Sequence, residues 1–517
     1  MQQYDYYGIA RGCRSAAINL EARSLTSWST SRHCVLAKLK DLTIDSYENI
    51  KAKAGALLIM LPASFPSLIP DDREHLLTLE NAMLQQEVSI PVYFAKYSNK
   101  LDSVINEVSQ NSNTNDMSKS AVENIINSIA ANGYQVVVSS STPTIKTDAK
   151  IASIQGHLTA QRTEGKIPTI GIITYYDSFG VAPDLSFGAD SNGSGVVLLL
   201  ELVRLFSGLY ADVKTRGKYN LVFVLTGGGK INYQGSKKWL EDQVDPGGGT
   251  FFQDIFQHVT YFMCLDTLAT NDSLYMHVSK PPTKGSSALQ FYREMRRLGQ
   301  NQSVHVNMIH KKIRVDITSL GWEHERYRVR KFPAFTVSSL DNHADTAKAT
   351  ILDTRDNLDL DKLVMNTRII AEALAKQVYN LSAGEIFGGQ LVFHVQDASR
   401  EHMKAWIDFL TLQPRSPQLL INKDNVVVNS LKNAFNNYLT EVKVFYSVPE
   451  KRDPVFQFYD VTKGTLNVYS VKPAVFDLIL TLMIIVYLGI IYLCVDYFPR
   501  VYTIACSVTA NKKIKVN

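Results

Sequence analysis

Four short polar clusters in the middle of this 517-residue chain combine carboxylates, hydroxyls and a lysine, and apolar runs lie beside them. The clusters are Tyr175-Tyr-Asp-Ser178, Gly188-Ala-Asp-Ser-Asn-Gly-Ser-Gly195, Gly227-Gly-Gly-Lys-Ile-Asn-Tyr-Gln-Gly-Ser236 and Cys264-Leu-Asp266. Ligand sites in parallel α/β sheets lie at the carboxyl ends of strands, so we expect the clusters to meet at one edge of a sheet. Carboxylates gathered in this way are typical ligands of zinc, which activates water for hydrolysis.

The residue types within the clusters argue against a working metal centre, although Asp177 and Asp266 are suitable donors. Tyr175 offers a neutral phenol whose ordinary pKa is near 10, which makes it a poor zinc ligand. Lys230 brings an ammonium that repels a dication over a few ångströms. The pattern therefore predicts no bound metal and no cofactor. We expect Lys230 to pair with Asp177 or Asp266; the alternative is that it points from a loop into solvent.

A different catalytic set in place of the metal finds little support in the sequence. Ser178, His324 and His343 are available, but the stretch Asn192-Gly-Ser-Gly195 lacks the strand that directly precedes a nucleophile elbow. We expect His343 to lie in a loop. The run Gly-Gly-Gly-Lys230 lacks the spacing of a phosphate-binding loop. No residue is therefore predicted to be catalytic.

The apolar runs around the clusters predict the elements that position them. Strands are expected at 168–176, 219–225, 262–265 and 334–337, with helices at 196–206 and 361–379. Further strands are expected at 34–39, 56–61 and 92–95, alternating with helices, and the polar stretch 110–119 is expected to be an exposed loop. This alternation predicts an α/β fold with a mainly parallel sheet and helices on both of its faces.

Composition and length favour at least two folded units. The chain has 57.9 kDa and 45% hydrophobic residues, and cores stop growing beyond about 250–300 residues. We expect an N-terminal α/β lobe over 1–148, a sheet domain over 149–384 and a membrane-proximal segment over 385–471. The last of these has helices at 400–412 and 425–442 and a strand at 455–459. The net charge of +5, without a long basic block before the extreme C-terminus, argues against a nucleic-acid partner.

Residues 473–495 are predicted to form a transmembrane helix, because about 20 mostly apolar residues match the thickness of a bilayer core. The helix would run from Pro473 to Val495 within the segment 472–496, with Asp477 close enough to one end to reach the headgroups. A buried helix of a soluble domain is the alternative, but no polar face occurs from Leu478 onward. Asp496 suits the second interface, and 497–517 would form a short tail.

Positive residues after this segment predict that the tail is cytosolic, so the N-terminal portion would be lumenal or extracellular. Asn-x-Ser sequons are compatible with that placement. They lie at Asn192, Asn271, Asn301 and Asn380, of which the last three are candidate glycosylation sites. The polar start Met1-Gln-Gln-Tyr-Asp5 begins no signal peptide, so we expect a truncated or processed form. A cytosolic protein with a tail anchor is the alternative. A disulfide between Cys13 and Cys34 stays open, because two cysteines in a sequence do not establish one.

The four clusters resemble, in order, the metal-site motifs of the M28 family of di-zinc aminopeptidases. That family has His-x-Asp-Ser, Asp-Asn-(Ala/Gly)-Ser-Gly, Glu-Glu-x-Gly-Leu-x-Gly-Ser and a later Asp. The resemblance implies a zinc-aminopeptidase-like fold, and it also shows which metal-site residues are changed. Tyr175 stands at the position of a histidine ligand, and Gly229 and Lys230 stand at the positions of the general-base and metal-binding glutamates.

The remaining positions of the resemblance are mixed. Asp177 and Asp266 match ligands, whereas Ser191 stands where the metal-bridging aspartate belongs, with Asp190 adjacent. Glu323-His324-Glu325 aligns with a Ser-Asp-His segment, which implies that His324 is a hydrogen-bonded relic. The last histidine ligand has no counterpart near 353–356. The resemblance therefore implies a degenerate site in a pseudo-peptidase.

Within this superfamily the chain is similar to the nicastrin-like proteins, and among them to the nicalin family. Supporting stretches include Trp322-Glu-His-Glu-Arg326, Asn366-Thr-Arg-Ile-Ile-Ala-Glu-Ala-Leu374 and Val471-Lys-Pro-Ala-Val-Phe-Asp-Leu478. The resemblance implies a non-catalytic endoplasmic reticulum membrane subunit in contact with lipid. Its implied partners are the nodal modulator protein, a small multi-pass membrane protein and the translocon that inserts multi-pass membrane proteins; it also implies antagonism of Nodal signalling. The alternatives are a receptor for peptide termini, in which Asp177 or Asp266 holds an α-amine, and a residual zinc aminopeptidase.

Overall fold

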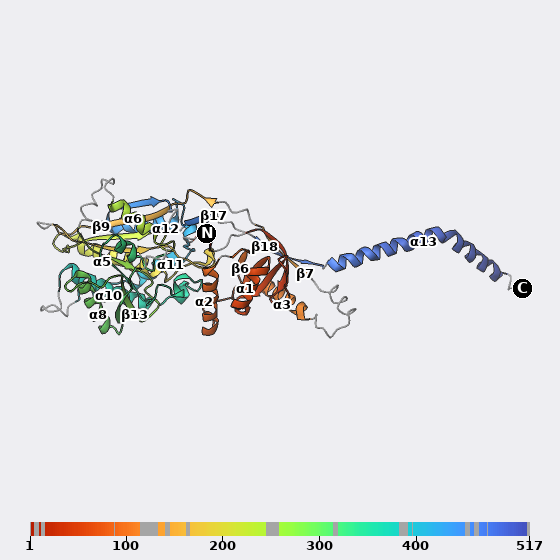
Figure 1. Ribbon diagram of the computed structural model, residues 1–517, viewed down its shortest axis with the longest axis horizontal. Coiled ribbons are helices and arrows are strands. Elements are labelled where there is room, and N and C mark those ends of the chain that lie inside the picture. Colours follow the sequence, from red (N-terminus) through yellow and green to blue (C-terminus); the bar gives the residue numbers. More distant parts are fainter. Residues whose placement is uncertain are drawn as a thin grey trace. The chain divides into compact units, whose positions relative to one another are not determined.

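The protein divides into two compact units in the computed structural model (Figure 1). The larger unit comprises Met1–Ser15, Ser64–Ser89 and Thr142–Lys463, and the smaller comprises Ala16–Ala63, Ile90–Ser141 and Gly464–Asn517. The structure describes residues 2–4, 10–11, 16–86, 88–113, 133–139, 145–161, 166–244, 258–313, 319–381, 391–394, 397–449, 455–459, 465–472 and 474–513. The domain limits expected from the sequence stay predictions.

An eight-stranded sheet organises the larger unit, with the order β14-β13-β15-β12-β10-β11-β9-β16. Strands β11, β10, β12 and β15 at its centre are mutually parallel, whereas β9, β16 and the β13–β15 pairing are antiparallel. The predicted mainly parallel sheet is thus confirmed at the centre. The strands are β9 (Ile151–Leu158), β10 (Thr169–Tyr175), β11 (Asn220–Thr226), β12 (Val259–Leu265), β13 (Ser273–Val278), β14 (His305–His310), β15 (Ala334–Ser338) and β16 (Thr440–Ser447).

Helices cover both faces of this sheet, because its central strands are apolar on both sides. Along β11, Leu221, Phe223 and Leu225 belong to one core, whereas Val222 and Val224 belong to the opposite core, as the two-residue repeat of a strand requires. The first face carries α5 (Gly193–Ala211), α8 (Ser287–Asn301), α10 (Leu360–Val378), α11 (Arg400–Leu410) and α12 (Val426–Tyr438). The second face carries α6 (Gln234–Val244) and α9 (His324–Val329).

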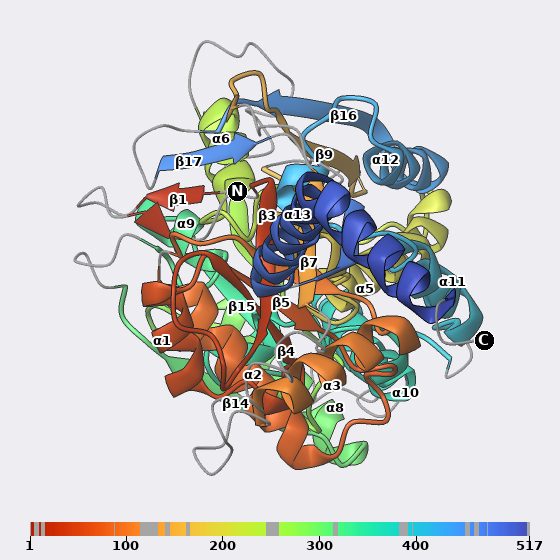
Figure 2. The same ribbon diagram turned by 90° about the vertical axis from the view of Figure 1, so that its right-hand side faces the viewer.

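The sequence predicted a helix over 425–442, and its end was wrong. Helix α12 stops at Tyr438, and residues 440–442 begin β16, which pairs with β9 at the edge of the sheet (Figure 2). Val442 and Val444 both pack against the core of the sheet. A two-residue spacing places such side chains on one face of a strand, so burial favours the strand here.

Two further groups of elements complete the larger unit. A four-stranded sheet has the order β2-β1-β17-β8, and it contains the predicted strand at 455–459. Helix α2 (Pro70–Gln85) contacts the turn η4 (Thr346–Ala349), and its buried Glu80 accepts hydrogen bonds from Thr350 and from the backbone of Ile351. The strands are β1 (Gln2–Tyr4), β2 (Ala10–Arg11), β8 (Ile145–Lys146) and β17 (Val455–Tyr459).

The smaller unit is built on a six-stranded sheet of order β18-β7-β3-β4-β5-β6, with helices α1 (Ile44–Lys53) and α3 (Asn99–Asn113). The strands predicted near 34, 56 and 92 are confirmed. The expected loop at 110–119 was wrong at its start, because 110–113 belong to α3, whose Val108 is buried in the core; residues 114–119 lie outside the described residues. The strands are β3 (Ile18–Ser24), β4 (His33–Lys38), β5 (Ala56–Met60), β6 (Val92–Ala95), β7 (Gly133–Ser139) and β18 (Thr465–Val471).

Helix α13 (Ala474–Lys513) contains the candidate membrane span, residues Phe476–Thr509, with a mean hydropathy of 2.8 and no buried part. Asp477 and Val495 lie within it, whereas Pro473 lies outside the described residues. Pro499 lies inside the helix, which bends along its course in Figure 1, as proline within a helix favours. Helix α5 is also long and apolar, but it is mostly buried in the sheet domain.

The cysteines and sequons are now placed within this fold. Cys34 is a free, buried thiol of β4, and Cys13 lies outside the described residues. Asn192 is buried and its amide donates to Thr174 and to two carbonyls, so it is closed to glycosylation. The candidate sites Asn271, Asn301 and Asn380 are exposed.

Candidate functional site

The four polar clusters meet in the larger unit, as the sequence predicted from the ends of parallel strands. Asp177 follows β10, Lys230 follows β11 and Asp266 follows β12, while Asp190 and Ser191 lie just before α5. Asn192 caps α5, since its side chain accepts from the backbone N–H of Gly195 at 3.1 Å. Its amide also reaches the carbonyls of Tyr175 and Leu265, which ties the loop to two strand ends.

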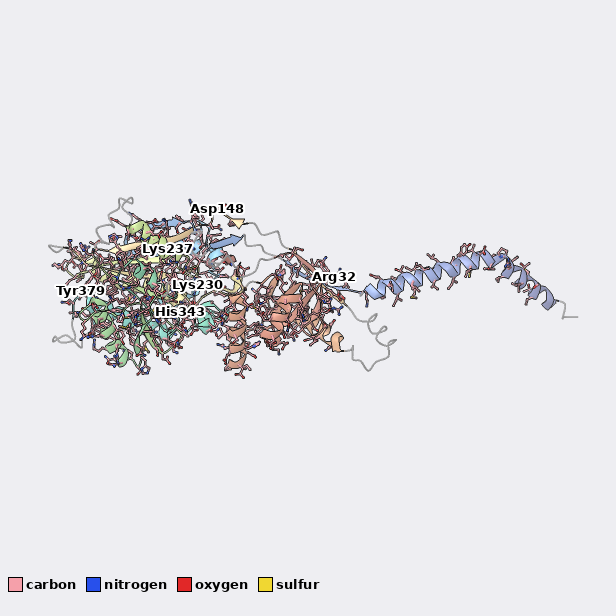
Figure 3. The ribbon with its side chains drawn as sticks, viewed as in Figure 1. Arg32, Asp148, Lys230, Lys237, His343 and Tyr379 are labelled. Atoms are coloured by element: carbon pink, nitrogen blue, oxygen red, sulfur yellow. The ribbon has the colours of Figure 1, made fainter. Side chains whose placement is uncertain are left out.

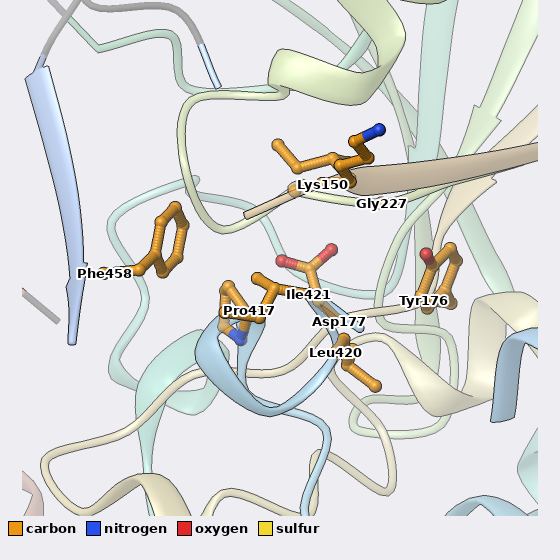
Figure 4. Close-up of a pocket in the computed structure, with 10 residues that line it drawn as sticks. Lys150, Tyr176, Asp177, Gly227, Pro417, Leu420, Ile421 and Phe458 are labelled. Carbon is orange, nitrogen blue, oxygen red and sulfur yellow. The ribbon is translucent and has the colours of Figure 1, made fainter. Parts of the chain in front are cut away.

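Asp177 binds the backbone at the end of the glycine run. Its carboxylate oxygens accept from the N–H groups of Gly229 and Lys230 at 2.7 and 2.9 Å. Burial raises the pKa of this carboxyl, while the two backbone donors and the Lys230 ammonium oppose that rise. Asp177 also lines a small pocket together with Lys150, Tyr176 and Phe458 (Figure 4). The side chain is therefore a loop anchor beside a small pocket.

Tyr175 and Gly229 depend on each other. The buried Tyr175 ring lies against Gly229 so closely that a Cβ on residue 229 would stand 2.1 Å from Tyr175 Cγ. The phenol donates to Asp266 Oδ1 at 2.9 Å. Burial, reinforced by Asp266, raises the pKa of Tyr175 well above its ordinary value, so the phenol stays a neutral donor. The ring thus excludes any side chain at the position where the resembled family carries its general base.

Asp266 forms an ion pair with Lys348, whose Nζ lies 2.7 Å from Oδ2. The pair is almost fully buried, with side-chain exposures of 1% and 11%. Burial favours a higher pKa for Asp266, but the ammonium groups of Lys348 and Lys230 outweigh it and hold the pKa below its usual range. Lys348 Nζ also stands 4.2 Å from the centre of the Trp322 ring, a cation–π distance. The carboxylate that matches a metal ligand is therefore neutralised by the chain itself.

Lys230 does not form the predicted pair with Asp177 or Asp266. Its Nζ donates at 2.7 Å to Ser191 Oγ and at 2.7 Å to the carbonyl of Lys348. Among the described residues no carboxylate oxygen lies within ion-pair distance of this ammonium. Burial, with a smaller effect of the Lys348 charge, lowers the pKa of Lys230 to about 8. The lysine that pairs with Asp266 is Lys348, which lies 118 residues after Lys230 in the chain. The prediction was wrong because it considered only the lysine within the motifs.

The alternative placement of Lys230 in solvent is also wrong. The side chain is half-buried in the larger unit (Figure 3), with its ammonium held on two sides and 5.2 Å from the centre of the Tyr175 ring. The ammonium therefore fixes the position of Ser191 and of the turn that carries Lys348. Its positive charge also acts on Asp177 and Asp266 through space.

Asp190 and Asp353 hold the loop before α5. Asp190 Oδ1 accepts from the N–H groups of Leu268 and Ala269 at 2.9 and 3.0 Å, and Oδ2 accepts from the Thr270 hydroxyl. Asp353 accepts from the N–H groups of Asp190 and Ser191 at 2.8 and 2.7 Å. Burial raises the pKa of both carboxyls, and with the added charge of Asp190 that of Asp353 reaches about 6.

His324 lies on α9 with both ring nitrogens in hydrogen bonds. Nδ1 is 2.9 Å from Thr336 Oγ1 and Nε2 is 2.9 Å from Ser279 Oγ. Burial lowers its pKa to about 3, so the ring is neutral. This geometry agrees with the hydrogen-bonded role that the sequence suggested. Ser178 donates to the Ser186 carbonyl, which leaves it without a base.

His343 lies in a turn of the larger unit (Figure 3), and its Nδ1 is 3.2 Å from Lys311 Nζ. Burial lowers its pKa, and the charges of Lys311 and Lys348 lower it further. In the part of the chain that the structure describes, its hydrogen-bond partner is a lysine and not a serine hydroxyl. The expected loop position is thus confirmed, and the geometry gives this histidine no part in a hydrolytic triad.

The residues present do not fit the zinc pair that the resembled family implies. Asp177, Asp190 and Asp266 have their oxygens in hydrogen bonds or an ion pair, and two ammonium groups stand among them. Zinc binding needs deprotonated ligands around an open position. No group of three or more His, Cys, Asp or Glu side chains arranged for a metal occurs in the described part of the chain.

Sequence reasoning missed Lys348, Asp353 and Arg415 as members of this site. Arg415 is fully buried, and its guanidinium donates to the carbonyls of Tyr176, Leu410 and Gly188 at 2.9, 2.7 and 2.7 Å. Burial lowers its pKa to about 10. No motif surrounds Lys348 or Arg415, so the sequence carried no signal for them. Asp353 lies in the stretch searched for the missing histidine ligand.

The chain is similar to known proteins in both sequence and fold. The model of Peptidase family M28 matches residues 159–374. The BOS complex subunit ncln of Danio rerio is 41% identical over 531 residues, which cover 99% of this chain and 92% of that protein. The BOS complex subunit NCLN of Homo sapiens is 42% identical over 506 residues, covering 97% and 89%. The crystal structure of the gamma-secretase component Nicastrin shares the fold, with a TM-score of 0.62, 11% identity and coverage of 91% and 98%.

Replacing Gly229 by alanine should destabilise the larger unit, because the new methyl group collides with Tyr175. We expect a loss of about 2 kcal/mol in the free energy of unfolding, the usual scale of overpacking. Denaturant titration of the purified chain measures it. In a Tyr175→Ala background the same change should cost less, since the ring is gone.

Gly208→Ala is the matched control, because Gly208 lies in α5 with nothing within 4 Å of a new Cβ. It should be neutral or gain about 0.5–1 kcal/mol from helix propensity. If Gly229→Ala lowered the free energy of unfolding equally with and without the Tyr175 ring, the ring would not be what excludes a side chain at residue 229.

Replacing Lys348 by methionine should destabilise the chain at neutral pH by about 3 kcal/mol or more, because a buried carboxylate is left unpaired. Asp266→Asn in the Lys348→Met background should recover part of the loss. Asp266 has a lowered pKa when folded, so its contribution is present above its unfolded value and is lost as pH falls. The gap between wild type and Lys348→Met should therefore shrink on acidification toward pH 3. A gap independent of pH would show that Lys348 acts only by packing.

Proposed function

Because this chain belongs to the nicalin family, whose relatives are named BOS complex subunits, we propose that it is a non-catalytic subunit of an endoplasmic reticulum membrane complex. Membership rests on 42% identity to the human protein over nearly the full chain. The candidate span in α13 and the nicastrin-like fold support this proposal. Two folded units and an apolar helix long enough to cross a membrane support such a role.

The observation that carries the non-catalytic part is the ion pair between Lys348 and Asp266. It fills, with an ammonium, the surroundings of a carboxylate that binds metal in the resembled family. Tyr175, which donates to the same carboxylate, leaves no room for a general base at residue 229. Hydrolysis by this route needs a metal-bound water and a base to accept its proton. The side chains support neither requirement.

We extend the proposal to the setting that the family resemblance implies. The subunit would belong to a translocon-associated complex that supports insertion of multi-pass membrane proteins, with the nodal modulator protein and a small multi-pass membrane protein as partners. Its larger part would be lumenal and its C-terminus cytosolic, a placement supported by Arg500 and the lysines that follow the span. The proposal also includes a role in antagonising Nodal signalling, which the resemblance implies.

A receptor for peptide termini is a second candidate, favoured only by the pocket beside Asp177. That pocket is lined by Ile421, Phe458 and the glycine run, and the Asp177 carboxylate faces it (Figure 4). An α-amine there would have to share the carboxylate with two backbone N–H groups that already bind it. The geometry therefore supports this function less well than it supports a scaffold.

The purified chain in lipid nanodiscs should contain far less than one zinc ion per molecule and should not turn over amino-acid 4-nitroanilides, even with added zinc. Metal analysis and an absorbance assay measure the two quantities, with an active M28 aminopeptidase treated in parallel. Two retained zinc ions per chain, or zinc-dependent release of nitroaniline, would contradict the non-catalytic proposal.

Affinity purification of the chain from endoplasmic reticulum membranes should recover the nodal modulator protein and a small multi-pass membrane protein in near-stoichiometric amounts, as mass spectrometry can quantify. Ile421→Phe, which fills the pocket beside Asp177, should leave this recovery unchanged, and Ile421→Val serves as its control. Loss of partners in a folded Ile421→Phe variant would favour the receptor. Recovery of neither partner would sink the scaffold proposal.

A further inference from the structure

Helix α13 is longer than a membrane requires. The apolar stretch Phe476–Thr509 has 34 residues, which at 1.5 Å per residue corresponds to about 51 Å. The hydrocarbon core of a bilayer is about 30 Å thick. Even a helix tilted by about 40°, the upper end of the usual range, would use only about 26 residues to cross it. At least one end of the stretch must therefore lie outside the hydrocarbon core.

The charged residues show which end this is. Asp477 and Asp496 are 19 positions apart with no charged residue between them, a separation of about 28 Å along a helix. Tyr497 follows directly, and Arg500 stands 5.4 Å from the centre of its ring. Tyrosine and arginine are typical of the membrane–water interface. The span therefore fits between Asp477 and Asp496, and the excess lies after it.

Pro499 separates the span from that excess. Proline removes one helical hydrogen bond and disfavours a straight course, and α13 bends in Figure 1. The hydroxyl of Thr503 donates to the carbonyl of Pro499, so the following turn is held from within. The helix continues beyond this point but can take a new direction there.

The helix after Pro499 has two unlike faces. Val501, Ile504 and Val508 recur at spacings of three and four residues, which places them on one face. Thr503 and Ser507, four residues apart, lie on a neighbouring polar face, and Arg500, four residues before Ile504, stands at its border with the apolar face. The three apolar side chains are 61%, 63% and 60% exposed. Before Asp496, by contrast, the helix is apolar all round, as a lipid-crossing segment requires.

We propose that residues 500–509 form an interfacial helix that lies along the surface of the phospholipid bilayer, with Val501, Ile504 and Val508 against the acyl chains. This inference rests on the membrane span and is independent of the scaffold role and the degenerate site. Lipid is the occupant because the span tethers this face at the bilayer surface, where the apolar stripe continues the span and Arg500 meets phosphate groups. The stripe consists of three side chains along the helix, which is a small area for a stable protein–protein interface.

Spin-label depth measurements on the whole chain in phosphatidylcholine–phosphatidylserine nanodiscs test the proposal. Cys13, Cys494 and Cys506 are first replaced by serine, while the buried Cys34 and Cys264 stay. Single labels then go to V501C, I504C and V508C on the apolar face, and to T503C and S507C on the polar face. Oxygen and a water-soluble nickel complex report the depth of each label.

An interfacial helix places the labels at 501, 504 and 508 at nearly equal depths, roughly 5–10 Å inside the headgroup boundary. The labels at 503 and 507 should be reached by nickel. A helix that continues through the membrane would instead separate 501 from 508 by about 10 Å in depth. V486C and L493C, seven residues apart within the span, give that difference as an internal control. A 10 Å difference between 501 and 508, or apolar-face labels shielded from both probes by a protein partner, would overturn the proposal.

Discussion

The buried ion pair of Lys348 and Asp266 is the interaction on which the character of the site depends. A carboxylate at this depth must be neutralised, either by a metal or by the chain. Lys348 provides the positive charge. Its turn is followed by Thr350 and Ile351, which donate hydrogen bonds to Glu80 of α2. Lys230 then holds the carbonyl of Lys348, and Asp177 holds the backbone of Lys230. The polar side chains at these strand ends therefore form one connected network.

The framework of this site could be predicted from the sequence, because it depends on local patterns. The strand ends after residues 175, 226 and 265 follow from apolar runs, and the cap of α5 follows from Asn192 before a long apolar helix. The degenerate positions Tyr175, Gly229 and Lys230 were assigned by their order along the chain. The parallel sheet brings these residues together, because its strands end at the same edge.

The partners of these residues could not be predicted, because they come from distant segments without a motif. Lys348 lies in a short turn and Arg415 in a loop, and neither position has a periodic pattern around it. The sequence analysis therefore paired Lys230 with Asp177 or Asp266, the carboxylates within the same set of motifs. The antiparallel β16 was hidden for a related reason: Val442 and Val444 suit a strand only once β9 is present beside them.

The ammonium groups of Lys348 and Lys230 stand among the carboxylates where the resemblance to M28 peptidases implies zinc. Anomalous diffraction at the zinc edge, from crystals of the protein soaked in excess zinc, tests it most directly. The account predicts no anomalous peak among Asp177, Asp190 and Asp266, with Lys348 Nζ still bound to Asp266. Two peaks at about 2.0–2.2 Å from these carboxylates, with Lys348 displaced, would contradict it.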